Sequence, residues 1–279
     1  PAVCLEPGVA DLYILDSSGW TGDPNGNTNW LRMSRITGTA AAPQWSALPG
    51  SGTVKAGFFP VQNRFSNTIL AAAQRDAATG LHAGDTRMCN VVYRNGRLWA
   101  VHSGGYPADT PDRNAIFWYE LQPSLPSPII QSGIIQSGGP NAHYIYPSIG
   151  VNCGNDVCIG FTSTSPAIYP SACYVTRLAG DAPGATSATL YYRDGRAKYV
   201  KTSASDSRNR WGDYSATVVD PLDDKTFWTL QEYAELPSLG VDRWAVLWAQ
   251  ITRDCPTPGI TGHPQSQAGQ TPRFGEGLQ

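Results

Sequence analysis

The side chains best suited to chemistry are concentrated between positions 208 and 234. Arg210, Asp213 and Tyr214 lie in one short segment, and Glu232 follows on the next predicted pair of strands. Two carboxylates on neighbouring segments can act as acid and base, or as acid and nucleophile, in the hydrolysis of a glycosidic bond. These four side chains therefore form a candidate catalytic group, and the separation of its two carboxyl groups would decide the stereochemistry.

The same segment also has a structural interpretation. Asp213 follows Gly212, and an aspartate in a tight turn accepts hydrogen bonds from nearby backbone N–H groups. Arg210 would then pair with Asp213 or Asp220, and Tyr214 would fill an interface between sheets. Because turn-capping aspartates are commoner than catalytic ones, the structural interpretation is favoured at Asp213.

A second loop has the composition of a cation site. Asp23, Asn25 and Asn27 place side-chain oxygens at alternate positions around Gly26, and calcium prefers oxygen ligands. The loop is shorter than an EF-hand loop and lacks its closing glutamate, so a plain Asn-Gly turn is the favoured alternative. No nucleotide cofactor is implied, because no glycine-rich phosphate loop follows a predicted strand.

The cysteine pattern indicates disulfides. The six cysteines include no Cys-x-x-Cys pair, and no histidine stands at zinc-ligand spacing from them. Cys153 and Cys158 flank a Gly-Asn-Asp turn and are predicted to be linked, the alternative being two buried free thiols. Disulfides imply an oxidising compartment, so we expect a secreted or cell-surface protein. The start at Pro1 further suggests that a signal peptide or a longer N-terminal region has been removed.

The composition and charge of the chain argue against some classes of binding partner and in favour of others. Twenty basic residues nearly cancel 22 acidic ones, so there is no broad basic field for nucleic acid or an anionic membrane. No run of residues is long and apolar enough for a membrane-spanning helix. Nine tryptophans and 13 tyrosines on a chain with only 15% charged residues suit the stacking of sugars, although most large aromatic side chains are expected in the core.

Short β-branched or aromatic runs bounded by Gly, Asp or Ser predict strands along most of the chain. Four such runs are each followed by a second, more aromatic run, which indicates a repeated two-strand unit. The first runs are 11–15, 97–102, 157–161 and 226–230, and the second runs are 29–33, 115–119, 171–175 and 243–248. Residues 68–75 are also expected to form a strand.

These runs, with 29 glycines and 22 prolines, predict an all-β fold. A β-propeller is the leading architecture and a β-sandwich the alternative. The spacing of the units, roughly 60 to 85 residues, exceeds that of a compact blade, so long loops or one undetected blade between Trp45 and Asp85 are expected. Residues 1–255 are predicted to form one propeller-like domain, and 256–279 a Pro- and Gly-rich tail.

Three further features carry a family resemblance. The segment RNRWGDYSATVVDP (208–221), the run YRNGRLW (93–99) and the run YPSI (146–149) resemble bacterial secreted proteins of the BNR-repeat, sialidase-like β-propeller type, which mostly lack an assigned activity. The resemblance covers roughly residues 10 to 250 and implies a propeller that forms the C-terminal part of a larger precursor. No stretch reproduces the Asp box of true sialidases, and this departure from the family pattern argues against sialidase chemistry itself.

The resemblance also suggests which residues would hold a ligand. Sialidases bind their substrate with three arginines, and Arg87, Arg177 and Arg210 are available for such a group. Trp211 adds an aromatic side chain in the most distinctive segment. The resulting expectation is a protein that binds or hydrolyses glycans, and the alternative is a non-catalytic propeller that contacts another extracellular or cell-surface protein.

The calcium hypothesis can be tested by chelation. A cation bound only to the folded protein stabilises it by mass action. If the 23–27 loop holds calcium, EDTA should therefore lower the melting temperature by several degrees, as measured by scanning calorimetry. An unchanged melting curve would leave only the turn interpretation.

Overall fold

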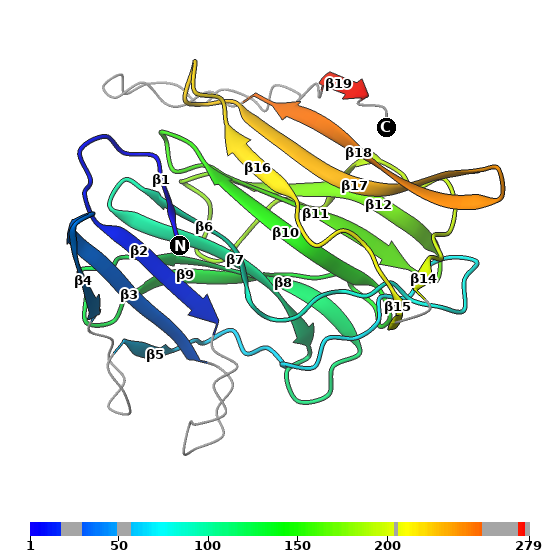
Figure 1. The fold of residues 1–279 in the computed structure, drawn as a ribbon, viewed down its shortest axis with the longest axis horizontal. Helices are drawn as coiled ribbons and strands as arrows, with labels where there is room; N and C mark the ends of the chain where they lie inside the picture. The colour runs from blue at the N-terminus through cyan, green and yellow to red at the C-terminus, as the bar shows by residue number, and fades with distance from the viewer. Residues whose placement is uncertain (18–29, 49–56, 204–205, 253–272, 277–279) are drawn as a thin grey trace.

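The chain is built from β-strands throughout the part that the structure describes. The structure is a computed structural model, and it describes residues 1–17, 30–48, 57–203, 206–252 and 273–276. Within these ranges the chain forms nineteen strands and no helix, arranged in five sheets (Figure 1). None of the sheets closes on itself. The predicted all-β class is confirmed.

Two sheets come from the N-terminal half of the chain. The first has the order β2-β3-β4, and β5 also pairs with β3. Its strands are β2 (Leu12–Ser17), β3 (Trp30–Thr39), β4 (Ala42–Ala47) and β5 (Phe58–Pro60). The second sheet has the order β1-β6-β7-β8-β9 and is antiparallel except for the parallel pair β1 and β6. Its strands are β1 (Val3–Cys4), β6 (Met88–Arg94), β7 (Arg97–Tyr106), β8 (Arg113–Leu121) and β9 (Ile129–Ile135).

The C-terminal half contributes two larger sheets and a small hairpin, all antiparallel. The third sheet consists of β10 (His143–Val151), β11 (Val157–Ser165), β12 (Ile168–Arg177) and β13 (Leu190–Arg193), in that order. The fourth consists of β16 (Ala216–Val219), β17 (Phe227–Ser238), β18 (Val241–Ile251) and β19 (Arg273–Glu276). The hairpin between them pairs β14 (Thr202–Ser203) with β15 (Asp206–Asn209).

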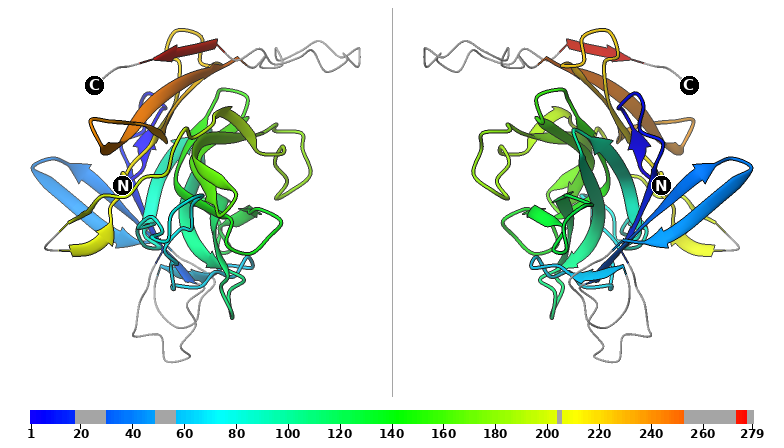
Figure 2. Two further views of the ribbon diagram at one scale, coloured as in Figure 1. Left: turned by 90° about the vertical axis from the view of Figure 1, so that its right-hand side faces the viewer. Right: turned by 90° about the vertical axis from the view of Figure 1, so that its left-hand side faces the viewer.

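The four larger sheets pack face to face in chain order (Figures 1 and 2). Each of three apolar clusters draws its members from two consecutive sheets. Representative pairs are Met33 and Phe117 in the first cluster, Trp118 and Phe161 in the second, and Tyr174 and Phe227 in the third. The second and third sheets therefore have both faces covered.

Strand β7 shows how the sequence produces this packing. Successive side chains of a strand point to opposite faces. Leu98 and Ala100 belong to the cluster shared with the first sheet, whereas Trp99 and Val101 belong to the cluster shared with the third sheet. A strand with two buried faces needs apolar residues at consecutive positions, and the run LWAV at 98–101 supplies them.

The interface between the third and fourth sheets also contains a buried network of hydroxyl and amide groups. Ser148 Oγ lies 2.8 Å from Thr217 Oγ1, which lies 2.9 Å from Thr229 Oγ1. Gln231 Nε2 donates to Ser148 at 3.1 Å and to Thr229 at 2.9 Å. Gly160 lies beneath this network, because a Cβ atom there would collide with Gln231 and Thr229.

A long irregular segment, residues 61–87, crosses the ends of the sheets (cyan in Figure 1). The strand predicted for residues 68–75 is wrong, since only one isolated bridge, between Ala72 and Leu81, occurs there. The backbone of Leu70 is instead held by the side chain of Asn114, with hydrogen bonds of 2.9 and 2.8 Å. The undetected blade predicted before Asp85 is also absent from residues 57–85, which contain only β5.

The predicted Cys153–Cys158 disulfide is absent, since no two of the described cysteines lie at disulfide distance. Cys158 is fully buried on β11 in the cluster shared by the third and fourth sheets, whereas Cys153 lies in the turn that precedes β11. This turn is closed by Asn152, whose side-chain oxygen accepts hydrogen bonds from the N–H groups of Gly154 and Asp156, both at 2.9 Å. Side-chain capping of the turn therefore replaces the predicted covalent link.

The predicted strand runs and the predicted C-terminal tail can also be compared with the structure. All eight runs of the predicted two-strand units overlap observed strands. In the predicted tail, residues 273–276 form β19 and pair with β18, so this part of the tail belongs to a sheet.

Gly160 offers a direct test of the interface between the third and fourth sheets. Gly160→Ala should lower the free energy of unfolding by about 1–3 kcal/mol, because the added methyl group must displace Gln231 or Thr229. Chemical denaturation measures the change. Gly138→Ala is the matched control, since a Cβ there meets no atom within 4 Å, and an equal loss in both variants would contradict the packing described.

Candidate functional site

The carboxyl group of Glu232 lies against the backbone of Gly212. A Cβ atom at position 212 would collide with both carboxylate oxygens of Glu232, so the contact requires a glycine. The N–H of Gly212 hydrogen-bonds to the carboxylate, and the hydroxyl of Thr162 donates to the backbone carbonyl of Glu232 at 3.2 Å. The turn before β16 thereby covers a carboxyl group on β17.

This position changes the acidity of Glu232. Burial raises the pKa of Glu232 to about 7, the hydrogen bond from Gly212 opposes the increase, and the charge of Asp213 adds to it. A carboxyl group with such a pKa is partly protonated near neutral pH and can serve as a proton donor. Among the predicted catalytic residues, Glu232 therefore has the environment of a general acid.

Asp213 pairs with Arg210, which is one of the two pairings predicted for this arginine. Arg210 Nη2 donates to Asp213 Oδ2 at 2.7 Å, and the two side chains are 46% and 43% exposed. An ion pair this accessible contributes little to stability, because water screens it. Asp213 thus remains accessible to solvent and to a ligand. The predicted turn-capping role would not have required this accessibility.

Tyr214 is 84% exposed, so the prediction that it fills an interface between sheets is wrong. Arg87 lies nearby, and its pKa is raised mainly by Asp85, with a smaller contribution from Tyr214. Arg87 Nε and Asp85 are 2.8 Å apart. Tyr214, the Arg87–Asp85 pair and the Arg210–Asp213 pair together form an accessible surface that we call the Tyr214 rim.

Tyr146 connects the rim to Glu232, and sequence reasoning did not select it as a site residue. Burial raises its pKa, with further contributions from Asp213 and Glu232, while Arg210 opposes the increase. Its φ of 52° is unusual for a residue other than glycine, and it occurs at an irregularity in β10 between Ile145 and Ser148. The only sequence signal was the Tyr-Pro pair at 146–147.

Neighbouring groups hold Tyr146 in this conformation. Its hydroxyl donates to the carbonyl of His82 at 2.9 Å, and Ser215 donates to the carbonyl of Tyr146 at 2.8 Å. Gly84 leaves room for the ring, since a Cβ there would lie 3.1 Å from Cε1. The crossing segment and the turn before β16 therefore fix Tyr146 beside the candidate acid.

Two residues predicted to bind ligand have structural positions instead. Trp211 is buried, stacks edge-on against Tyr199 with ring centres 5.1 Å apart, and directs Nε1 to Thr162 at 3.4 Å. Arg177 is buried at the end of β12, where it donates to the carbonyls of Leu178 and Asp181 at 2.5 and 3.0 Å. The predicted group of three arginines is therefore not assembled, because only Arg87 and Arg210 reach the rim.

The predicted calcium ligands, Asp23, Asn25 and Asn27, lie outside the described residues. Within the described ranges no three His, Cys, Asp or Glu side chains are grouped so that they could hold a metal ion.

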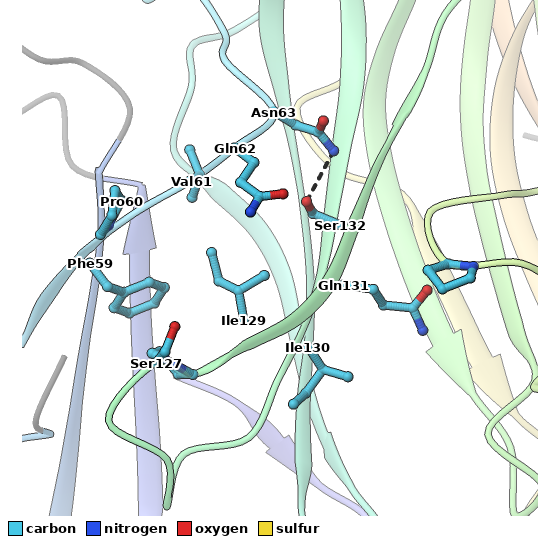
Figure 3. A pocket seen from close by; sticks show the side chains of 12 residues that line it. Phe59, Pro60, Val61, Gln62, Asn63, Ser127, Ile129, Ile130, Gln131 and Ser132 are labelled. Atoms are coloured by element: carbon cyan, nitrogen blue, oxygen red, sulfur yellow. Dashed lines mark hydrogen bonds between the residues drawn. The ribbon is translucent and has the colours of Figure 1, made fainter. Parts of the chain in front are cut away.

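A separate cavity of about 400 Å³ lies between β9 and the segment that follows β5 (Figure 3). Phe59, Val61 and Ile129 line it, together with amide and hydroxyl side chains such as Gln62 and Asn63. None of the residues of the Tyr214 rim contributes to this cavity. The structure thus contains two distinct candidate sites.

Comparison with known proteins adds no assignment. No family model, no curated protein and no solved structure matches the chain. The resemblance to sialidase-like proteins therefore remains a prediction. Of the residues that the structure describes, none belongs to a helix capable of spanning a membrane.

The environment of Glu232 predicts a pH-dependent contribution to stability. The folded protein holds this proton up to pH about 7, whereas an unshifted glutamate releases it near 4.5. The folded state therefore binds more protons in that window, and the contribution of Glu232 to stability falls as the pH rises through it. In denaturation series from pH 4 to 8, Glu232→Gln should gain stability relative to the wild type by about 3 kcal/mol. A difference that does not change with pH would contradict the assignment.

Proposed function

We propose that the chain is a glycan-binding protein whose ligand occupies the Tyr214 rim. The observation that carries this proposal is the juxtaposition of an exposed tyrosine, two arginine–aspartate pairs and the covered, proton-holding carboxyl group of Glu232. The exposed ring of Tyr214 offers a face for the apolar side of a sugar. Arg87, Arg210 and Asp213 offer hydrogen-bonding groups for hydroxyls or for a carboxylate.

We further propose that the bound glycan is hydrolysed. Glu232 would donate its proton to the glycosidic oxygen of the leaving group while the bond to the anomeric carbon breaks. Depending on the distance between the two carboxyl groups, Asp213 would either accept a proton from the attacking water or attack the anomeric carbon directly. In the second case Glu232, now deprotonated, would accept a proton from a water molecule that breaks the bond between Asp213 and the sugar. The exposure of the two groups supports this division of roles: Glu232 is shielded by Gly212 but only partly buried, so it can still reach a ligand, and Asp213 stays accessible.

The proposal includes a propeller-type arrangement of the four larger sheets outside the cytoplasm. Their consecutive face-to-face packing supports it, and so do hydrogen bonds that link the turns of successive sheets at one end. Asn95 donates to the carbonyl of Cys153 at 3.2 Å, and the N–H of Cys153 donates to the carbonyl of Asp224 at 3.0 Å.

A non-catalytic scaffold is the second candidate function. The pairing of Asp213 with Arg210 favours it, because this carboxylate already has a hydrogen-bond partner within the protein. In this case the rim would contact another cell-surface or extracellular protein.

The glycan proposal can be tested with two substitutions that separate binding from catalysis. Tyr214→Ala should weaken glycan binding about tenfold, because the stacking face is lost, without changing the melting temperature. Glu232→Gln should reduce turnover by about 10²–10⁴-fold, because an amide cannot donate an acidic proton. It should leave binding nearly intact, because the amide has the shape of the carboxyl group. A glycan array followed by calorimetry and a hydrolysis assay supplies the measurements.

Trp45→Ala is the matched control, because Trp45 is an exposed aromatic side chain on β4 of the first sheet. Equal affinities for Tyr214→Ala and Trp45→Ala would exclude the rim as the glycan site. Binding without any turnover in the wild type would retain the binding proposal and reject the catalytic one. The scaffold function would be favoured if no glycan binds.

A further inference from the structure

The cavity beside β9 has the features of a second binding site, independent of the Tyr214 rim. Its volume of about 400 Å³ lies within the range of ~300–1,000 Å³ that is usual for small-molecule sites. It is bounded on one side by Phe59, Val61, Gln62 and Asn63 and on the other by the first half of β9 (Figure 3).

None of the described residues that line this cavity has an acidic, basic or histidine side chain. A charged ligand would lose its hydration here without gaining an ionic partner. The cavity therefore selects for an uncharged molecule, in contrast to the rim with its two arginines.

The lining combines an apolar floor with free polar groups. Phe59 and Val61 are buried in the first apolar cluster, and Ile129 packs against that cluster. The side chains of Gln62 and Ser127 point into the cavity (Figure 3), and neither makes a side-chain hydrogen bond with any described residue. Such a floor suits the C–H face of a ring, and the polar groups suit hydroxyls at its edge.

The carboxamide side chains in the lining of the cavity indicate which kind of polar ligand fits it best. Each carboxamide presents a donor beside an acceptor, which matches two adjacent hydroxyl groups. Asn63 donates to Ser132 Oγ at 3.0 Å, and this bond orients the Asn63 amide while its oxygen remains available. Gln131 is already occupied, since it accepts from Gly184 at 3.0 Å and donates to Glu120 at 2.5 Å.

Prolines argue against the addition of a peptide strand. Pro60, Pro128 and Pro183 line the cavity, and proline has no N–H group to donate to an extended peptide. We propose that this cavity binds a neutral saccharide, with one ring face on Pro60 and Ile129, which are both accessible, and its hydroxyls on Gln62, Asn63 and Ser127.

The test is calorimetric titration of the full chain with neutral disaccharides, for which cellobiose, maltose and lactose are the probes. Glucuronic acid, glucosamine and decaproline serve as the charged and peptide comparators. We expect saturable binding of at least one neutral disaccharide, with shifts in the NMR methyl signals of Val61 and Ile129. Gln62→Ala and Ser127→Ala should each weaken that binding about tenfold, since each removes a hydrogen-bonding group.

Both substituted residues are exposed, and unchanged melting curves confirm that these variants fold. Gln44→Ala, at an exposed glutamine on β4, is the matched control and should bind as the wild type does. Tyr214→Ala should also leave this binding unchanged, which separates it from binding at the rim.

The proposal is overturned if none of the three disaccharides binds at millimolar concentration. It is also overturned if Gln62→Ala and Ser127→Ala bind as tightly as Gln44→Ala, or if the charged sugars or decaproline bind this cavity more tightly than the neutral sugars do.

Discussion

The second and third sheets each have two apolar faces, and every other feature of the structure depends on how those faces are covered. Burial of apolar surface is the dominant favourable contribution to folding, and a sheet with two such faces needs a neighbour on each side. The first and fourth sheets supply those neighbours. A stack of four sheets is the consequence, and it leaves the connecting segments to run across the ends of the sheets.

The connecting segments build the Tyr214 rim. Segment 61–87 brings Asp85 and Arg87 to one end of the stack, and the turn before β16 brings Gly212 onto Glu232. The position of Glu232 along β17 is fixed by the residue before it, since Gln231 is hydrogen-bonded to Ser148 on the third sheet. A register slip of one residue would reverse the faces of β17 and remove Glu232 from Gly212. The buried polar network therefore fixes both the register of β17 and the position of the candidate acid.

The sequence predicted the strands well because their signal is local. Runs such as LWAV at 98–101 carry their own periodicity, whereas residues 68–75 have a similar composition and form no strand, because Asn114, distant in sequence, holds their backbone. The candidate carboxylates were found from residue type, but the exposure of Tyr214 and the burial of Trp211 depend on which sheets meet. Tyr146 and the cavity beside β9 were not predicted, since both arise from contacts between segments far apart in the chain.

The protonation of Glu232 is the central claim, and its side chain can be observed directly. In a protein labelled with ¹³C at the glutamate carboxyl carbons, the signal that disappears in Glu232→Gln identifies the residue. Its chemical shift can then be followed as the pH is varied. A midpoint near 7 is expected because the burial of the carboxyl group and the charge of Asp213 outweigh the hydrogen bond from Gly212. A midpoint near 4.5, the ordinary value for a glutamate, would contradict both the enclosure and the assignment of Glu232 as the acid.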